Sequence, residues 1–473
     1  MSKDKDIFEN IKCILSQSSQ VHCIFVNVIS KIKLPNLPKD SRTRFNREAL
    51  IKWMILTKLL QVETVHQSKK SQWSIFITMG KDVLYNVKNN PYINWRGILL
   101  DQANQSMKGI SIEEDSRSQS SIPCLILDDT DIPKRGKCIE WIGRIFSHVT
   151  HKHDLGFKSL NLAYWSGKHL LHLDFSFHVE MGKKKNQGMK KSELKDRYKK
   201  ERKDNSMGAR RIEELVKKKT DCAIKMITRA LKKGIESSYI LADSWFFNSA
   251  LAAFAIDKKV HLISRPKFNN WKYKYNGKLY TIGELIRKKN RNKEVKWNRH
   301  LRLKFIKVPV EFQGLQITLI YYKSKKRGSD WKSLVTTDNT LSAQKAFKIY
   351  QTRWSIENSY KELKQHLRYG KCMSRDFDGQ ISDATQCLMA YNILSQQKAI
   401  NQHQSIGMLF DKISKQWLKP TMMQKFWKEF YDIIKKIAEE IGTEIDILID
   451  LAINQSSFLL QLSKLNLIAT TET

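Results

Sequence analysis

Two short apolar runs, each closed by aspartate, constrain the fold of this chain more than any other feature. They are IPCLILDDTD at 122–131 and SSYILADSWF at 237–246. A short apolar run bounded by polar residues is typical of a buried strand. Helical patterns lie between and after these runs. The order predicts an α/β domain whose sheet holds acidic side chains at fixed positions where its strands end.

Three acids on successive elements form the candidate catalytic set: Asp129, Asp243 and Glu357. A phosphodiester is cut most directly by two divalent metals about 4 Å apart that carboxylates hold. Mg²⁺ prefers such oxygen ligands and keeps several waters, so three carboxylates suffice. An aspartate after a strand is nonetheless more often a turn or helix-cap residue. Asp128 and Asp131 also compete with Asp129, and alternation places Asp128 and Asp129 on opposite faces of the strand.

The helical pattern from 341 to about 369 carries the third acid on a polar stripe. At about 100° per residue, four side chains project within about 60° of one another: Tyr350, Arg353, Glu357 and Lys364. A carboxylate beside two cations and a phenol is suited to gripping a phosphate next to a metal. Because Arg353 and Glu357 are also an i,i+4 pair, an ordinary salt-bridged helix face is the competing interpretation.

The charge of the chain points to a polyanionic partner. Lys and Arg number 84 against 47 Asp and Glu, which gives a formal net charge of +37 over 473 residues. Such a charge favours nucleic acid first and an anionic membrane surface second, while a merely basic protein is the plain alternative. No run of about 18 apolar residues predicts a membrane span, and the start MSKDKDIFENIK is too polar for a signal peptide.

Cysteine and histidine usage excludes other classes of site. Seven scattered cysteines without a Cys-x-x-Cys pair argue against a disulfide scaffold and a zinc ribbon, and suit a reducing cytosol. The histidines of SHVTHKHDLG, with Asp154, lack the spacing of a known metal-ligand set, so a polar strand or loop is expected there: His148, His151 and His153. The segment 131–137, DIPKRGK, lacks the glycine pattern of a P-loop, which argues against nucleotide hydrolysis.

The patterns divide the chain into five segments, namely a helical region at 1–118, a mixed core at 119–266, a β-rich insertion at 267–338, a helix with the third acid at 339–372 and a helical region at 373–473. Locally, the polar stretch 101–121 predicts a linker, the runs around Ser-Gly-Lys within 159–180 predict a hairpin, and 209–234 predicts one helix. The basic stretch 181–206 is either a solvated excursion or a phosphate contact.

The spacing of the helix identifies a family resemblance. Tyr350, Arg353, Glu357 and Lys364 match the Y-R-E-K signature without a gap, and the two aspartate-ended strands precede it in the expected order. Over about 120–370 the chain resembles DDE transposases of the insertion-sequence 4 group. The resemblance implies a ribonuclease-H-like core, with a β-rich insertion, that carries Asp129, Asp243 and Glu357. It also implies two divalent cations, Mg²⁺ or Mn²⁺.

The same resemblance implies how DNA is held and cut. Tyr350, Arg353 and Lys364 would hold the transposon end, and cleavage would pass through a DNA hairpin with a flipped base stacked on Trp331. A core strand residue is the alternative interpretation of Trp331. The resemblance also implies that the protein acts as a homodimer on double-stranded transposon ends and target DNA. It further implies that the protein is located at the nucleoid in a bacterial cytoplasm. The N-terminal helices would then recognise the end, and the C-terminal helices would form the dimer.

Two other functions stay open at this point. One is a simple nuclease of similar fold without strand transfer, and the other is a catalytically silent DNA-binding remnant. The Y-R-E-K helix and the tryptophan argue against the nuclease, and the presence of all three acids argues against the remnant.

Overall fold

The computed structural model describes residues 29, 32–34, 37–38, 46–59, 80–114, 122–401, 405–410, 433 and 435–444, apart from 148–149, 183, 185, 292–293 and 327. The helical region expected at 373–473 therefore lies partly outside the described residues. In the part of the chain that is described, no helix is both long enough and apolar enough to cross a membrane.

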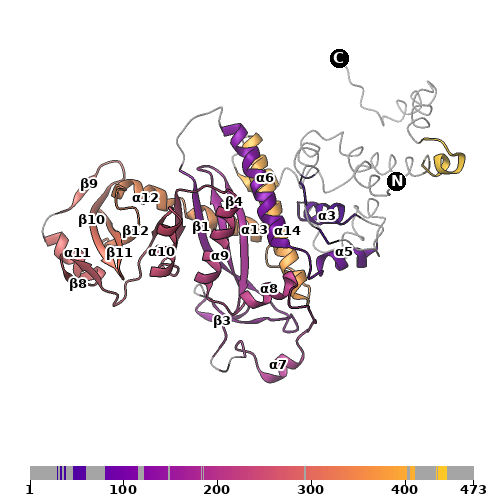
Figure 1. The fold of residues 1–473 in the computed structure, drawn as a ribbon, viewed down its shortest axis with the longest axis horizontal. Helices are drawn as coiled ribbons and strands as arrows, with labels where there is room; N and C mark the ends of the chain where they lie inside the picture. The colour runs from indigo at the N-terminus through magenta and orange to yellow at the C-terminus, as the bar shows by residue number, and fades with distance from the viewer. Residues whose placement is uncertain are drawn as a thin grey trace, which may run out of the picture. The chain divides into compact units, whose positions relative to one another are not determined.

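A large mixed sheet with flanking helices confirms the α/β prediction (Figure 1). The strands are β1 (Cys124–Pro133), β2 (Gly143–Ser147), β3 (Lys152–Trp165), β4 (Leu170–His178), β5 (Tyr239–Ala242), β6 (His261–Ser264), β7 (Tyr273–Tyr275), β8 (Lys278–Tyr280), β9 (Lys296–Asn298), β10 (Leu303–Phe312), β11 (Leu315–Ser324) and β12 (Lys332–Thr336). Their order is β2-β3-β1-β5-β6-β12-β11-β10-β7-β8, with β4 paired to β3 and β9 to β10. The strands of the β-rich stretch thus continue the core sheet through β12 and β6.

Strand β1 lies at the centre of the core part of this sheet. It is antiparallel to β3 and parallel to β5, which is in turn parallel to β6. Its apolar residues Leu125, Ile126 and Leu127 are fully buried, as expected for a strand that is covered on both faces. β1 runs on to Pro133, because β3 pairs with it beyond the last residue of β5. The sequence pattern had placed the acids of DDTD at the end of the strand, but they lie within β1.

The hairpin predicted around Ser-Gly-Lys is confirmed. β3 and β4 pair in antiparallel fashion from Lys158 with His178 to Trp165 with Leu170. Gly167 in the connecting turn has a φ of 110°, a conformation that side chains rarely adopt.

The described helices of eight or more residues are α3 (Arg47–Leu59), α5 (Lys81–Lys88), α6 (Trp95–Glu114), α8 (Met207–Glu214), α9 (Lys219–Lys232), α10 (Ser249–Asp257), α11 (Ile282–Arg291), α12 (Ala343–Gln351), α13 (Trp354–Gln365) and α14 (Phe377–Asn401), and α7 (Lys191–Lys195) is a single turn. α6 and α14 lie side by side along β4 (Figure 1). α13 contacts β1, and α9 contacts β3 and β4.

The linker predicted at 101–121 is wrong for its first part, because 101–114 belongs to α6. The polar residues that suggested a linker are buried and bonded to α14. Ser106 Oγ donates to Gln396 at 2.9 Å, and Asn392 Nδ2 donates to Gln102 at 3.0 Å. Hydrogen bonds between two buried helices thus replace the apolar periodicity on which the prediction depended. Residues 115–121 lie outside the described part.

Two helices expected to be continuous are each broken in two. The stretch 209–234 forms α8 and α9, and the stretch from 341 onward forms α12 and α13. At the second break, Thr352 Oγ1 donates to the carbonyl of Ile349 at 2.7 Å, and the backbone N–H of Arg353 bonds to Tyr350 at 3.1 Å. Bonds to the third residue back tighten the turn and restart the helix after Arg353.

The chain divides into two compact units. One contains 1–31, 40–84 and 411–473, and within it the structure describes α3, whose buried face includes Leu50, Trp53 and Met54. The other contains 32–39 and 85–410, and it includes the described sheet, α6 and α14. The candidate site lies within this second unit.

Candidate active site

The paired strands β1 and β5 bring the first two acidic positions together. Leu127 of β1 lies opposite Ala242, the last residue of β5, so Asp128 and Asp243 follow at the same level of the sheet. The loop after β5 is held in place, since Asp243 Oδ1 accepts the backbone N–H of Trp245 at 2.9 Å. The carboxylates of β1 and Asp243 therefore meet at this point of the sheet.

Helix α13 brings Glu357 to the same place. Arg353 connects the two elements: its guanidinium lies 2.5 Å from a Glu357 oxygen and 3.5 Å from an Asp128 oxygen. Further along, Lys364 Nζ donates to Thr130 Oγ1 of β1 at 2.6 Å. Arg353 and Lys364 of the polar stripe thus lie against β1, even though the helix is broken at Arg353.

The two neighbouring aspartates of β1 point to different elements. Asp128 is 8% exposed and lies on the side of α13. Burial raises the pKa of Asp128 to about 8; Asp129, Asp243 and Glu357 add to the rise, and Arg353 opposes it. The pKa of Asp243 is raised as well, first by burial and then by Asp129. These mutual effects show that the four carboxylates share one electrostatic neighbourhood.

Asp129 lies on the other side of β1, as alternation along the strand requires. It forms an ion pair with Lys219 at the start of α9. Asp129 and Asp243 line one cavity of about 240 Å³ together with Trp245 and Lys219. Asp131, the third competing aspartate, is paired with Lys158 of β3 at 2.8 Å.

Tyr350, on α12, is the remaining residue of the Tyr-Arg-Glu-Lys set. Its side chain is 7% exposed, and the guanidinium of Arg353 lies 5.8 Å from its ring centre. Burial raises the pKa of the Tyr350 hydroxyl, so that it stays a neutral donor. Within the described residues, neither the Tyr350 hydroxyl nor Arg353 Nε has a hydrogen-bond partner. Buried donors without partners next to carboxylates suit a ligand that supplies acceptor oxygens.

The donor chemistry of this group fits a divalent metal, but the acids are paired with cations. Over the described part of the chain, no three His, Cys, Asp or Glu side chains are grouped so that they could hold a metal ion. Lys219 neutralises Asp129, and Arg353 neutralises Glu357. Carboxylate oxygens are the ligands that Mg²⁺ prefers. By the chemistry of their oxygens these residues therefore fit such an ion.

The other predicted residues lie elsewhere. Trp331 directly precedes β12, is half-buried and packs against the hydrophobic core, so its stacking role stays a prediction. His153 is the second residue of β3, with its ring 5.3 Å from that of Phe146, and His151 is exposed in the preceding turn. His148 lies outside the described residues.

Four residues of the site were missed from the sequence. Tyr360 donates from its hydroxyl to the backbone carbonyl of Asp128 at 3.1 Å, and its position four before Lys364 placed it on the same side of the helix. Trp245 is exposed two residues after the second acid. Lys158 and Lys219 carried no such signal, because each meets its aspartate only through the fold.

Two family models match parts of the chain that contain the site. Residues 217–393 match the family model described as transposase DDE domain, and residues 100–272 match the one described as DDE superfamily endonuclease. The chain matches no curated protein. The two matched segments together contain all the acids described above. They support a DDE transposase, a nuclease-type enzyme that acts on DNA, and the superfamily implies a ribonuclease-H-like core, which agrees with the mixed sheet and its flanking helices.

Proposed function

We propose that this chain is a cut-and-paste transposase of the insertion-sequence 4 group. The observation that carries the proposal is the meeting of carboxylates from β1, the end of β5 and α13 with the cations of the Y-R-E-K helix between them. An isolated salt-bridged helix would not need two further acids from neighbouring parallel strands. The two family matches add independent support.

In this proposal Asp129, Asp243 and Glu357 hold two divalent cations, Mg²⁺ or Mn²⁺. Bound in this way, the ions would lower the pKa of the attacking oxygen and stabilise the leaving one. Asp128 is the rival of Asp129, since it lies nearer to α13 and shares Arg353 with Glu357. The cavity shared by Asp129 and Asp243 supports Asp129.

The remaining residues of the site would position DNA. The guanidinium of Arg353, the ammonium of Lys364 and the hydroxyl of Tyr350 would hold the terminal phosphate of the transposon end. The unpartnered donors on Tyr350 and Arg353 support this role. Trp331 would stack on a flipped base, although its packing against the core equally suits a structural role.

One site would carry out the whole reaction, because every step is an in-line phosphoryl transfer with similar charge development. A first cut frees a 3′-hydroxyl at the end of the element, and that hydroxyl attacks the opposite strand to give a hairpin. Opening of the hairpin and attack on target DNA complete the transfer. Both ends must be paired, so we include a homodimer, with end recognition in the N-terminal region and dimer contacts in the C-terminal region.

Cleavage of a duplex that carries the element's own end tests the proposal. Wild type, Glu357→Gln and the matched surface control Glu236→Gln are incubated with Mg²⁺ or EDTA, and products are separated on a denaturing gel. We expect nicks and hairpins with Mg²⁺ for wild type and control, and no products for Glu357→Gln. Parallel assays of Asp128→Asn and Asp129→Asn decide which aspartate is essential.

The outcomes separate the alternatives. Nicks without hairpins would favour the simple nuclease. Binding without cleavage at any divalent metal would favour the silent DNA-binding protein. Full activity in Glu357→Gln would refute the assignment of the third acid.

A further inference from the structure

Three neighbouring cavities form a path that begins at the acids. The cavity beside Asp129 and Asp243 shares Lys219 and Trp245 with a second cavity of about 410 Å³. The second cavity shares Lys217 with a third of about 360 Å³, which is lined by α8, α9, the start of α14 and residues 90–96. A continuous surface therefore leads from the carboxylates along the start of α9.

Trp245 stands at the beginning of this path. Its side chain is 43% exposed, although large apolar side chains in this core are mostly buried. The Nζ atoms of Lys219 and Lys267 lie 4.5 Å and 5.9 Å from its ring centre. Its backbone N–H is bonded to Asp243, which holds the backbone of this residue next to the second acid. An exposed aromatic ring flanked by cations is the arrangement that binds an unpaired base and its phosphates.

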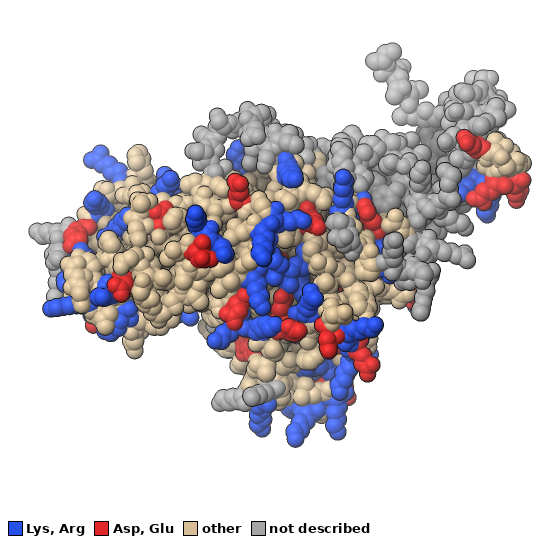
Figure 2. Space-filling model, viewed as in Figure 1, with Lys and Arg blue, Asp and Glu red and all other residues tan. Residues whose placement is uncertain are grey.

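Cations continue along the path beyond Trp245. Lys217 and Lys218 are exposed, and with Lys219 and Lys267 they line the second cavity. Figure 2 shows Lys and Arg side chains gathered over the part of the core where Figure 1 draws α8 and α9. Acidic side chains are interspersed among them, and Glu213 pairs with Lys217 at 2.8 Å. Exposed lysines gathered at one cavity attract the charged backbone of a nucleic acid.

The far end of the path carries a buried excess of positive charge. Arg96 bonds to Asp174 at 2.8 Å and to Glu214 at 2.6 Å, and Arg229 bonds to Asp174 at 2.6 Å. Arg211, only 6% exposed, shares Glu214 at 3.5 Å and is the third guanidinium for two carboxylates. Its Nη2 atom has no hydrogen-bond partner within the described residues. The cluster therefore attracts one more anionic group.

We propose that this path binds a single DNA strand that leaves the active site. An unpaired base stacks on Trp245, its phosphates contact Lys217, Lys218 and Lys267, and the strand runs towards Arg211. A paired base offers no free face to the indole, so the path prefers a single strand to a duplex. The inference rests on the proposed function for its choice of DNA, but it assigns residues that the acids and the Y-R-E-K helix do not include.

Binding without catalysis tests the inference. A fluorescently labelled 20-nucleotide single strand and the blunt duplex of the same sequence are titrated with full-length protein in EDTA, and anisotropy is measured. The matched control for Trp245→Ala is Trp297→Ala, because Trp297 is 42% exposed with Lys325 Nζ 5.8 Å from its ring but lies on β9. We expect roughly tenfold weaker single-strand binding for Trp245→Ala, little change for Trp245→Phe and none for Trp297→Ala.

Salt dependence tests the backbone contacts separately. In Lys217→Ala/Lys218→Ala, the slope of log affinity against log salt should fall by about 0.7 for each lost phosphate contact. Circular dichroism shows whether each variant is folded. Equal weakening by Trp245→Ala and Trp297→Ala, or a loss confined to the duplex, would overturn the inference. Because these titrations contain EDTA, a wild type that fails to cleave with Mg²⁺ refutes the proposed function without altering them.

Discussion

His172 makes the stability of the core depend on pH in a direction that the structure specifies. The ring is fully buried on β4, with Nε2 3.1 Å from Ser359 Oγ. Since that hydroxyl donates its proton to the Ile356 carbonyl at 2.6 Å, it accepts from Nε2–H. Nδ1 has no partner within the described residues, and the nearby rings of Tyr360 and Tyr391 offer no counter-charge. Protonation would therefore bury an uncompensated charge.

The size of the effect follows from the pKa. Burial lowers the pKa of His172 from 6.5 to about 3, so the unfolded chain binds more protons than the folded chain between these values. Stability is then lost as pH falls below 6.5. At pH 5 the unfolded histidine is mostly protonated and the folded one is neutral. This pH lies about 1.5 units below the pKa of 6.5 in the unfolded chain. At about 1.36 kcal/mol per unit, His172 costs about 2 kcal/mol of unfolding free energy between pH 7.5 and pH 5.

Urea unfolding at pH 7.5 and pH 5, followed by circular dichroism with each transition fitted separately, measures this cost. His172→Gln should lose about 2 kcal/mol less than wild type over the interval, whatever its stability at pH 7.5. The exposed His300→Gln is the matched control and should follow wild type. Other buried histidines cancel because all three proteins retain them. Parallel pH profiles for wild type and His172→Gln would refute the reasoning.

Further predictions concern packing and buried charge. Arg202→Ala should lower the unfolding free energy by about 3–5 kcal/mol, because it removes the cation that pairs with buried Glu140 and one of the two cations that pair with Asp378, whereas the exposed Lys203→Ala should change it by less than about 0.5 kcal/mol. Equal urea midpoints would contradict this. Gly156→Ala should cost about 1–3 kcal/mol, since a Cβ would lie 2.3 Å from the Ile132 carbonyl oxygen. Gly283→Ala in α11 meets no atom within 4 Å and should gain up to about 1 kcal/mol; a similar loss in both glycine variants would count against the steric argument.

The strands near the site were predictable because their signals are local. Apolar runs closed by Asp marked β1 and β5, and the polar pair around Gly167 marked the β3–β4 hairpin. The meeting of Asp243 with the acids of β1 depends on the parallel pairing of β1 with β5, which the sequence patterns did not specify. The exact end of β1 did not follow, because β3 extends the strand through residues that its own pattern cannot reveal.

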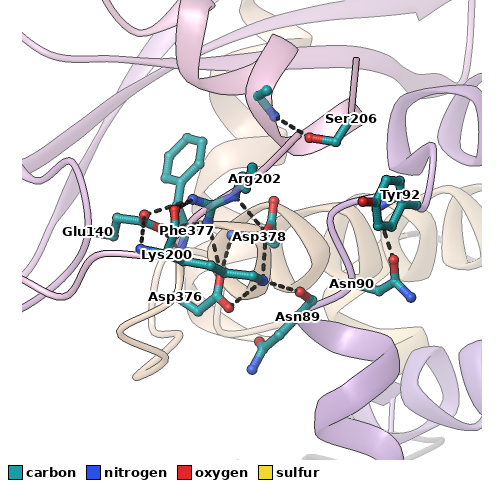
Figure 3. A network of polar contacts seen from close by, with 11 residues as sticks. Asn89, Asn90, Tyr92, Glu140, Lys200, Arg202, Ser206, Asp376, Phe377 and Asp378 are labelled. Carbon is teal, nitrogen blue, oxygen red and sulfur yellow. Dashed lines mark hydrogen bonds and ion pairs between the residues drawn. The ribbon is translucent and has the colours of Figure 1, made fainter. Parts of the chain in front are cut away.

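The basic stretch 181–206 shows where local signals stop. Its composition suggested either a solvated excursion or a phosphate contact, but two of its cations are bonded into a buried network (Figure 3). Arg202 lies 2.6 Å from Glu140 and 2.9 Å from Asp378, and Lys200 lies 2.8 Å from Asp376. Asp376, which directly precedes α14, and Asp378, which lies in α14, are each more than 170 positions away from these cations in the sequence. No periodicity links such distant charges, so the fold alone tells the buried cations from the solvated ones.

The same limit applies to the acids of the site, and it affects their chemistry. Clustered carboxylates repel one another and lose solvation, so some must bind protons or cations. Asp128 takes mainly the first course, because burial raises its pKa to about 8 although Arg353 opposes the rise, and Asp129 takes the second through Lys219, which lies 90 positions away in the chain. A strand pattern gives the position of each acid but not the cation that it meets. The charge on each carboxylate, which decides whether it can bind a metal, is therefore a property of the fold and not of the motif.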